Sequence, residues 1–223
     1  MSVGTAEIIE FYDNRLSDVM EHHSINNGRM NRVKHILNSI IKPWMSVLDV
    51  GCGIGVTSKH MVNIGAEVVA IDIAPKLIDH AKEHFGSREI TYIACDILNF
   101  ESKQAFDAIV FVDVIEHIKP ENLSLIVAKL ANNTNSSTLI YVSIPDANFI
   151  NFMKKNYPDK LQIIDESYSV EFITGLFSRF GFVPSYINIY GLDANIQWNE
   201  YIFQKPEDLN HHYKDRLSKI YNH

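Results

Sequence analysis

The sequence predicts an α/β protein with a mostly parallel sheet, helices on both faces of that sheet, and an antiparallel hairpin at its end. Short β-branched runs alternate with longer amphipathic segments, which is typical of parallel strands joined by crossover helices. A glycine-rich segment follows the first of these runs, where such sheets commonly bind a ligand. The last two runs are rich in aromatic residues and are separated by turn residues, which predicts the hairpin.

The elements follow in order along the chain. Two helices are predicted before the first strand, at residues 5–23 and 27–41, from apolar residues that recur three or four positions apart. The five strands of the parallel part are predicted at residues 46–50, 67–72, 90–94, 106–112 and 138–143. The helices between and after them are predicted to end at Ile64 and to span residues 75–84, 121–132 and 169–180. The hairpin strands are predicted at residues 182–190 and 196–203, and a polar helix at residues 205–220.

The chain has no internal repeat and no linker rich in Gly or Ser, so it is expected to fold as a single compact domain. Residues 1–42 are predicted to form a helical cap or lid, and residues 43–205 the ligand-binding core. Residues 206–223 are predicted to add a C-terminal helix. Because 46% of the 223 residues are hydrophobic, the chain can bury a full core.

The composition excludes several classes of function. A net charge of −7 argues against a nucleic-acid partner, since such proteins usually present a basic face to phosphates. No apolar run approaches the roughly 18 residues of a membrane span, and the first residues lack the pattern of a signal peptide. Two cysteines, Cys52 and Cys95, are typical of a reducing compartment. We therefore expect a cytoplasmic protein that acts on a small molecule.

The glycine-rich segment has the pattern G-x-G-x-G at residues 51–55. Glycines at such a turn let the backbone pass close to a ligand. The spacing differs from the G-x-G-x-x-G of dinucleotide enzymes, so the ligand need not carry a pyrophosphate. Asp49 precedes the glycines, where it would repel a phosphate and could receive an ammonium group.

Two further acidic residues end the next two predicted strands. Asp72 lies 72 − 51 = 21 residues after Gly51, where a carboxylate can accept both hydroxyls of a ribose. Asp96 follows the third strand and could bind the amino group of an adenine. Since the carboxyl ends of parallel strands meet at one edge of a sheet, these residues predict a site for an adenosine-containing ligand.

These motifs resemble those of the class I S-adenosylmethionine-dependent methyltransferases across roughly residues 30–205. The matching segments are LDVGCGIG at 48–55, Asp72, CDI at 95–97, FDAI at 106–109 and VDVIEHI at 112–118. Within that class the chain is most similar to the ubiquinone-biosynthesis O-methyltransferases. The resemblance implies a Rossmann-like sheet of seven strands, mostly parallel, with an antiparallel strand in the C-terminal hairpin. It also implies a biosynthetic enzyme that converts S-adenosylmethionine to S-adenosylhomocysteine.

The resemblance also implies which residues bind the cofactor. Gly51, Asp72 and Val112 match cofactor-binding positions of the ubiquinone-pathway enzymes. An arginine that meets the methionine carboxylate in that family is nearest in register to Arg32, with Arg29 as the alternative. Ile73 is expected on the adenine face, and Asp49 near the methionyl ammonium. The remaining predicted cofactor contacts are Cys52, Gly53, Asp96, Ile97 and Asp113.

The segment Asp113-x-x-Glu116-His117 is predicted to place its three side chains on one side of a helical turn. In one interpretation His117, beside Glu116, is a general base that takes a proton from a hydroxyl. In another, which resemblance to the ubiquinone-pathway and small-RNA 2′-O-methyltransferases implies, all three residues bind a divalent metal. In a third they are purely structural. We favour the base, because Asp113 is shorter than the Glu of those enzymes and no later histidine follows before Asn210.

The sequence thus predicts a methyltransferase that acts on a small-molecule acceptor, with O-methylation by in-line SN2 transfer. Tyr12 and Arg15 in the predicted lid are candidate contacts to that acceptor. The alternatives are an N-methyltransferase acting on a small amine, an RNA 2′-O-methyltransferase, and a non-catalytic adenosyl-binding subunit.

Overall fold

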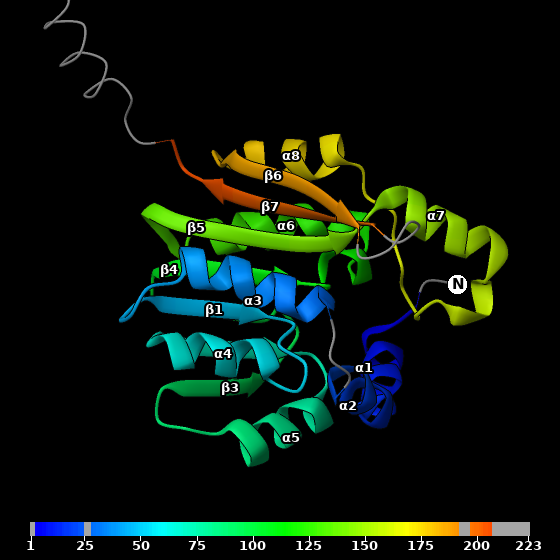
Figure 1. Ribbon diagram of the computed structural model, residues 1–223, viewed down its shortest axis with the longest axis horizontal. Helices are drawn as coiled ribbons and strands as arrows, with labels where there is room; N and C mark the ends of the chain where they lie inside the picture. Colours follow the sequence, from blue (N-terminus) through cyan, green and yellow to red (C-terminus); the bar gives the residue numbers. More distant parts are fainter. Residues whose placement is uncertain (1–2, 25–27, 192–196, 207–223) are drawn as a thin grey trace, which may run out of the picture.

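The computed structural model describes residues 3–24, 28–191 and 197–206 and contains a seven-stranded sheet (Figure 1). The strand order is β3-β2-β1-β4-β5-β7-β6, and β7 runs antiparallel to both of its neighbours. The other adjacent pairs are parallel. The strands are β1 (Ser46–Val50), β2 (Glu67–Asp72), β3 (Ile90–Ala94), β4 (Phe106–Val112), β5 (Thr134–Pro145), β6 (Val183–Gly191) and β7 (Gln197–Gln204). The predicted fold class is confirmed.

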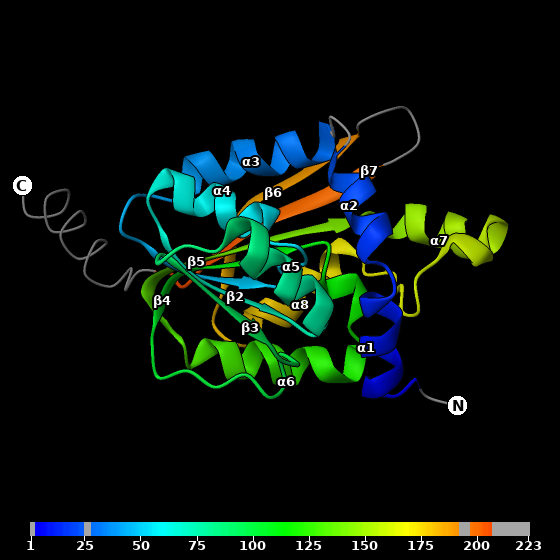
Figure 2. The same cartoon turned by 90° about the horizontal axis from the view of Figure 1, so that it is seen from below.

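Helices cover both faces of the sheet, as Figure 2 shows with α3 above it and α6 below. Side chains of α3, α4 and α5 share one buried cluster, and side chains of α6 and α8 share the other. The helices are α1 (Thr5–Asp13), α2 (Leu16–Ser24), α3 (Gly28–Ile40), α4 (Val56–Ile64), α5 (Pro75–Phe85), α6 (Pro120–Ala131), α7 (Ala147–Asn156) and α8 (Val170–Ser178), with short 3₁₀ helices η1 (Ile115–His117) and η2 (Pro158–Lys160). No helix in the described part of the chain is both long and apolar enough to span a bilayer.

Local sequence explains where several helices begin and end. Pro75 and Pro120 occupy the first positions of α5 and α6, where a missing N–H costs nothing. Asp146 and Ser169 cap α7 and α8 by accepting hydrogen bonds from backbone N–H groups of the first turn. Gly65 ends α4 in a left-handed conformation, with φ of 109°.

The prediction of one helix over residues 5–23 is wrong, because the chain breaks between α1 and α2. The N–H of Asn14 still bonds to the carbonyl of Glu10, but the N–H of Arg15 bonds to Tyr12 in a tighter turn. The break brings Asp13 to α5, where its carboxylate accepts a hydrogen bond from the N–H of Lys76 at 2.9 Å. Because the helix is interrupted here, α1 can lie across the end of the sheet.

Two other parts of the sequence prediction need comment. Residues 146–168, for which no element was predicted, contain α7, η2 and a segment that runs back to α8. The predicted C-terminal helix at 205–220 lies outside the described residues, apart from residues 205 and 206, and the predicted hairpin turn at 191–195 does so apart from Gly191. The division into a lid, a core and a C-terminal helix stays a prediction.

Candidate functional site

A cavity of about 350 Å³ lies at the carboxyl ends of β1, β2, β3 and β4. The helix α1 closes it on one side, at the end of the sheet toward which β2 points (Figure 2). Eight residues predicted to bind cofactor or substrate, or to act in catalysis, line this cavity: Tyr12, Gly51, Asp72, Ile73, Asp96, Ile97, Asp113 and His117. These predicted residues therefore lie together at one edge of the sheet.

The glycine loop follows β1, and its first residue, Gly51, lines the cavity. The N–H groups of Gly51 and Cys52 both donate to the carbonyl of Ile71, which ties the loop to β2. Gly51 has φ of +68°, and a Cβ atom placed on it would lie 2.4 Å from Cγ2 of Val114. A side chain at this position would be both strained and blocked, so the requirement for glycine is local and steric.

Asp72 lies at the end of β2 with both carboxylate oxygens held by backbone N–H groups. Its Oδ2 accepts from the N–H of Gly53 at 2.9 Å, and its Oδ1 accepts from the N–H of Ala74 at 2.9 Å. Burial raises the pKa of this carboxyl, and the backbone hydrogen bonds oppose that effect. A carboxylate oxygen can accept more than one hydrogen bond, and Asp72 lines the cavity.

Asp96 lies next to Asp72 on the cavity wall, at the end of β3. Its Oδ1 accepts a hydrogen bond from the N–H of Leu98 at 2.9 Å, which fixes the turn after the strand. Ile73 and Ile97 line the same cavity and give it apolar walls near these carboxylates. The arrangement suits a ligand that is flat and apolar on its faces and polar at its edges.

Asp49 does not point at the cavity. Its Oδ2 accepts hydrogen bonds from the hydroxyls of Thr57 at 3.0 Å and Ser58 at 2.6 Å, in the first turn of α4. Burial raises the pKa of the carboxyl to about 6, against the effect of these two hydrogen bonds. In the described structure this aspartate ties β1 to α4, and its predicted contact with an ammonium group stays a prediction.

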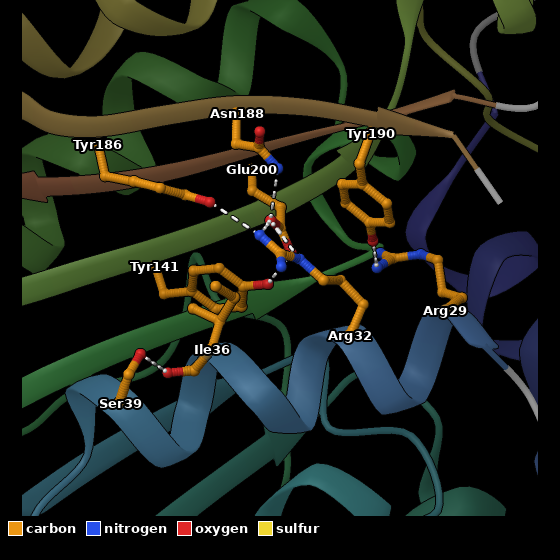
Figure 3. Close-up of polar contacts among 9 residues, drawn as sticks. All are labelled: Arg29, Arg32, Ile36, Ser39, Tyr141, Tyr186, Asn188, Tyr190 and Glu200. Atoms are coloured by element: carbon orange, nitrogen blue, oxygen red, sulfur yellow. Dashed lines mark hydrogen bonds and ion pairs between the residues drawn. The ribbon is translucent and has the colours of Figure 1, made fainter.

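Asp113 departs from the predicted geometry. It has φ of 54° and precedes the short helix Ile115–His117, so the prediction that it shares one helical turn with the other two residues is wrong. Its carboxylate lines the cavity and forms an ion pair with Arg29 of α3. Arg29 is only 4% exposed, donates to the hydroxyl of Tyr190 at 2.8 Å (Figure 3), and stacks on Trp198.

Arg32 lies one turn further along α3 and points to the hairpin (Figure 3). Its guanidinium donates to Oε2 of Glu200 from Nε at 3.0 Å and from Nη2 at 2.9 Å, and to the hydroxyl of Tyr186 at 2.8 Å. Glu200 also accepts from the hydroxyl of Tyr141 at 3.1 Å. The positive charge of Arg32 therefore compensates the negative charge of the buried Glu200 carboxylate between α3 and β7. The predicted contact of Arg32 with the methionine carboxylate stays a prediction.

His117 lines the cavity and is bound on its other side by the segment before α8. Its Nδ1 lies 2.7 Å from the carbonyl oxygen of Ile164 and 3.1 Å from Oδ1 of Asp165. Its Nε2 lies 4.0 Å from Oε1 of Glu116. Burial lowers the pKa of His117, but Asp165, Glu116 and the Ile164 carbonyl outweigh this effect and raise it to about 9.

Glu116 is buried, with 2% of its surface exposed, and is not among the residues that line the cavity. Its Oε2 has no hydrogen-bond partner within the described part of the chain. Burial raises the pKa of this carboxyl, although the neighbouring His117 favours its ionised form. Within that same part, no cluster of three or more His, Cys, Asp or Glu side chains has an arrangement that could hold a metal ion.

The two predicted lid residues lie differently. Tyr12 of α1 lines the cavity with its ring edge toward His117, the ring centroids being 6.0 Å apart. Its hydroxyl is buried without a hydrogen-bond partner among the described residues, and burial raises its pKa. Arg15 is not among the lining residues; its guanidinium lies over Phe11, 5.2 Å from the ring centroid, and near Asp18. Tyr12, and not Arg15, lines the cavity, and a contact of either residue with the acceptor stays a prediction.

Several residues predicted to bind the cofactor, and the predicted catalytic residue Glu116, are outside the lining of the described cavity, and other lining residues were missed. Those outside the lining are Arg32, Asp49, Cys52, Gly53, Glu116 and Val112. Lys119 and Ile164 line the cavity without having been predicted, and Lys119 donates to the carbonyl of Val3 at 2.9 Å. Lys119 lies two residues after His117 of the predicted motif, so its position in the sequence could have indicated it. Ile164 and Asp165 carry no motif that the sequence alone could reveal.

Comparisons with known proteins agree with this geometry. Residues 47–136 match the family model described as "Methyltransferase domain". This segment therefore resembles a methyltransferase domain. The segment holds the glycine loop, the acids at the ends of β2 and β3, and the Glu116–His117 pair.

Two curated relatives each match about half of this chain. The ubiquinone biosynthesis O-methyltransferase of Xanthomonas campestris pv. campestris (strain B100) is 34% identical over 108 residues, which are 47% of this chain and 44% of the relative. The malonyl-[acyl-carrier protein] O-methyltransferase of Anoxybacillus flavithermus (strain DSM 21510 / WK1) is 30% identical over 117 residues, 51% of this chain and 44% of the relative. The chain thus spans less than half the length of either relative.

Solved structures of methyltransferases share most of the fold of this chain at low identity. The N-methyltransferase NodS from Bradyrhizobium japonicum WM9, in complex with S-adenosylhomocysteine, has a TM-score of 0.74 at 14% identity and covers 90% of this chain and 99% of its own. A putative S-adenosylmethionine-dependent methyltransferase from Listeria monocytogenes has a TM-score of 0.66 at 17% identity, covering 78% of this chain and 97% of its own. These likenesses concern the fold.

Proposed function

We propose that this chain transfers a methyl group from S-adenosylmethionine to an oxygen atom of a small-molecule acceptor. One observation carries the proposal: a single cavity joins Asp72 and Asp96, which suit an adenosine, to His117, which suits a proton transfer. The methyltransferase domain and the two O-methyltransferase relatives support the same reaction.

The cavity fits the adenosine part of the cofactor. Asp72 presents a carboxylate to the cavity from the end of β2, which suits the two ribose hydroxyls. Asp96 and the backbone of Ile97 are placed to bind the adenine edge, and Ile73 to pack on its face. For the methionyl part, Asp113 on the wall beside the Gly51 loop is the acid that we assign to the ammonium group.

When bound, S-adenosylmethionine supplies a methyl group on a sulfonium sulfur and leaves as S-adenosylhomocysteine. The chain must hold an acceptor oxygen in line with that methyl group, in a cavity that α1 covers. We assign Nε2 of His117 as the atom that takes the hydroxyl proton while the new oxygen–carbon bond forms. The Tyr12 hydroxyl, which is buried and lacks a partner among the described groups, is assigned to hold the acceptor.

The protonation state of His117 matters for this role. With its pKa raised to about 9, the ring is mainly protonated at neutral pH before ligands bind. A positively charged sulfonium in the same cavity disfavours that second positive charge and lowers the pKa toward neutrality. Binding of the cofactor therefore prepares the base for the reaction.

The test is methyl transfer from S-adenosylmethionine with a labelled methyl group, measured on a panel of phenols, aliphatic alcohols, carboxylates, small amines and a short RNA. We expect O-methylated products from small hydroxyl compounds, and a loss of kcat by roughly 10²–10⁴-fold in His117→Gln. The Lys154→Gln variant serves as the control, because Lys154 pairs with Glu166 at a site that is not part of the cavity lining.

The panel also tests the alternatives. Products on amines alone would show an N-methyltransferase, and methylation of the RNA alone would show a nucleic-acid enzyme. Binding of S-adenosylhomocysteine without turnover on any acceptor would show a non-catalytic adenosyl-binding subunit. Each of these three results contradicts the proposed function.

A further inference from the structure

The segment before α8 is bonded at four points to the segment that contains His117. The N–H of Glu166 donates to the carbonyl of Glu116 at 2.7 Å, and the hydroxyl of Tyr168 donates to the carbonyl of Ile118 at 2.6 Å. Between these two bonds lie the contacts from His117 to the Ile164 carbonyl and the Asp165 carboxylate. The position of the imidazole is therefore determined by residues 164–168, far away in the sequence.

The partners of Nδ1 determine where the ring carries its proton. A backbone carbonyl can only accept a hydrogen bond, so at 2.7 Å from Ile164 the Nδ1 atom must be the protonated nitrogen. In the neutral ring Nε2 then carries the lone pair. Because Nδ1 is turned to the segment before α8, Nε2 is the nitrogen left for a ligand in the cavity.

Asp165 adds a negative charge to this arrangement. Its side chain is 9% exposed, and its Oδ1 lies 3.1 Å from Nδ1. Its Oδ2 accepts a hydrogen bond from the N–H of Gln162 at 2.6 Å, which fixes the carboxylate in a tight turn. A carboxylate held in this way orients an imidazole and stabilises the positive charge that the ring acquires when Nε2 takes a proton.

We propose that Asp165 is a positioning residue for methyl transfer: it holds His117 with Nδ1 protonated and Nε2 available to the acceptor hydroxyl. The inference rests on the proposed role of His117 as the base. Asp165 touches neither the acceptor nor the cofactor in this account. It acts through the ring of His117, as the Ile164 carbonyl does through the same nitrogen.

A purely structural role for Asp165 must be separated from this one, since its Oδ2 also closes the turn at Gln162. Asp165→Asn makes that separation, because the amide oxygen can still accept from the Gln162 N–H while the charge is lost. Glu166→Gln is the matched control. It removes a neighbouring carboxylate of the same segment, which faces Lys154 at 3.5 Å instead of His117.

The first readout needs no acceptor. The two ring nitrogens of His117 are followed by ¹⁵N NMR in protein labelled on histidine and saturated with S-adenosylhomocysteine, and His117→Gln assigns the signals. We expect the Nδ1–H signal to shift and to exchange faster with water in Asp165→Asn, and to stay unchanged in Glu166→Gln. Unchanged His117 signals in Asp165→Asn would overturn the proposal.

The second readout uses an acceptor found with the panel above. In Asp165→Asn we expect kcat to fall by about 10- to 100-fold, less than on loss of the base itself, with KM within about twofold. The affinity for S-adenosylhomocysteine should also stay within about twofold, because Asp165 is not in contact with the adenosine site. A fall in cofactor affinity as large as the fall in kcat would show a structural role only and overturn the proposal.

The two experiments fail separately. If the His117 signals respond to Asp165→Asn but no acceptor is methylated, the positioning contact stands and the proposed function is wrong. If methyl transfer requires His117 while Asp165→Asn alters neither the signals nor kcat, the proposed function stands and Asp165 has no part in it.

Discussion

The carboxylate of Asp72 accepts a hydrogen bond from the backbone N–H of Gly53 at 2.9 Å, so the end of β2 is bonded directly to the loop after β1. This contact joins the two sequence motifs that most strongly indicate an adenosine site. It also holds the carboxylate in place before a ligand binds. Binding therefore costs the protein little conformational entropy at this side chain.

The first prediction concerns the cofactor. Asp72→Ala should weaken the binding of S-adenosylhomocysteine by about 1.5–3 kcal/mol, because the ribose hydroxyls lose a charged acceptor. Isothermal titration calorimetry measures this directly. The control is Asp107→Ala, which removes a carboxylate at the opposite end of the sheet, where it accepts from the Ser46 N–H at 2.9 Å. Equal affinities in the two variants would refute the ribose assignment.

The second prediction compares two glycines of the same loop. Gly51 and Gly53 both have positive φ, of 68° and 54°, but a Cβ meets Val114 only at Gly51. Alanine is strained at either position, and at Gly51 it also overpacks the loop, so Gly51→Ala should lower the free energy of unfolding by about 1–3 kcal/mol more than Gly53→Ala. Urea denaturation measures both. Adding Val114→Ala should recover part of the difference; no recovery would exclude the steric cause.

The third prediction separates two roles of Arg32. Its side chain is 30% exposed, whereas that of Glu200, its partner, is 0% exposed. Arg32→Met leaves the Glu200 carboxylate buried without compensation and should lower the free energy of unfolding by about 2–3 kcal/mol, somewhat below the range for fully buried pairs. The exposed pair of Arg88 and Glu89 provides the control, since Arg88→Met should leave the free energy of unfolding nearly unchanged.

Cofactor binding distinguishes this account from the alternative that the sequence suggested. If Arg32 serves the contact between α3 and β7, Arg32→Met should leave the affinity for S-adenosylhomocysteine within about twofold in protein that is still folded. A tenfold loss of affinity would instead support a contact between Arg32 and the methionine carboxylate.

The fourth prediction is a dependence of stability on pH. His117 has its pKa raised to about 9 in the folded protein, above the ordinary value of 6.5, so its contribution is complete below pH 6.5 and is lost as the pH rises through 9. The raised pKa of buried Glu116 acts in the same direction. For His117 alone the loss amounts to about 3 kcal/mol.

The melting temperature should therefore fall between pH 6.5 and pH 9 in the ligand-free protein. His117→Gln removes one titrating group, so the slope should become shallower in that variant. The same slope in both proteins would show that His117 does not carry the effect.

The sequence predicted the parts of the site that depend on local motifs. Gly51, Asp72 and Asp96 each follow a strand whose position the apolar pattern reveals, and parallel strands bring their ends together. These residues could therefore be placed without any knowledge of side-chain packing.

The contacts between distant segments could not be predicted in this way. His117 and the Ile164 carbonyl are 47 residues apart, and no motif marks the segment before α8. The choice between Arg29 and Arg32 depends on which face of α3 meets Asp113 and which meets Glu200, a matter of packing. Asp113 does not belong to the predicted helical turn, because its backbone is in the left-handed region. The pattern of residue types does not reveal such a conformation.

The most direct test of the central claim is a crystal structure of the protein with S-adenosylhomocysteine. The account predicts electron density in the cavity under α1, with the ribose hydroxyls on the Asp72 carboxylate, the adenine beside Asp96 and the sulfur on the side of His117. Density for the ligand elsewhere, or a ribose that does not contact Asp72, would contradict it.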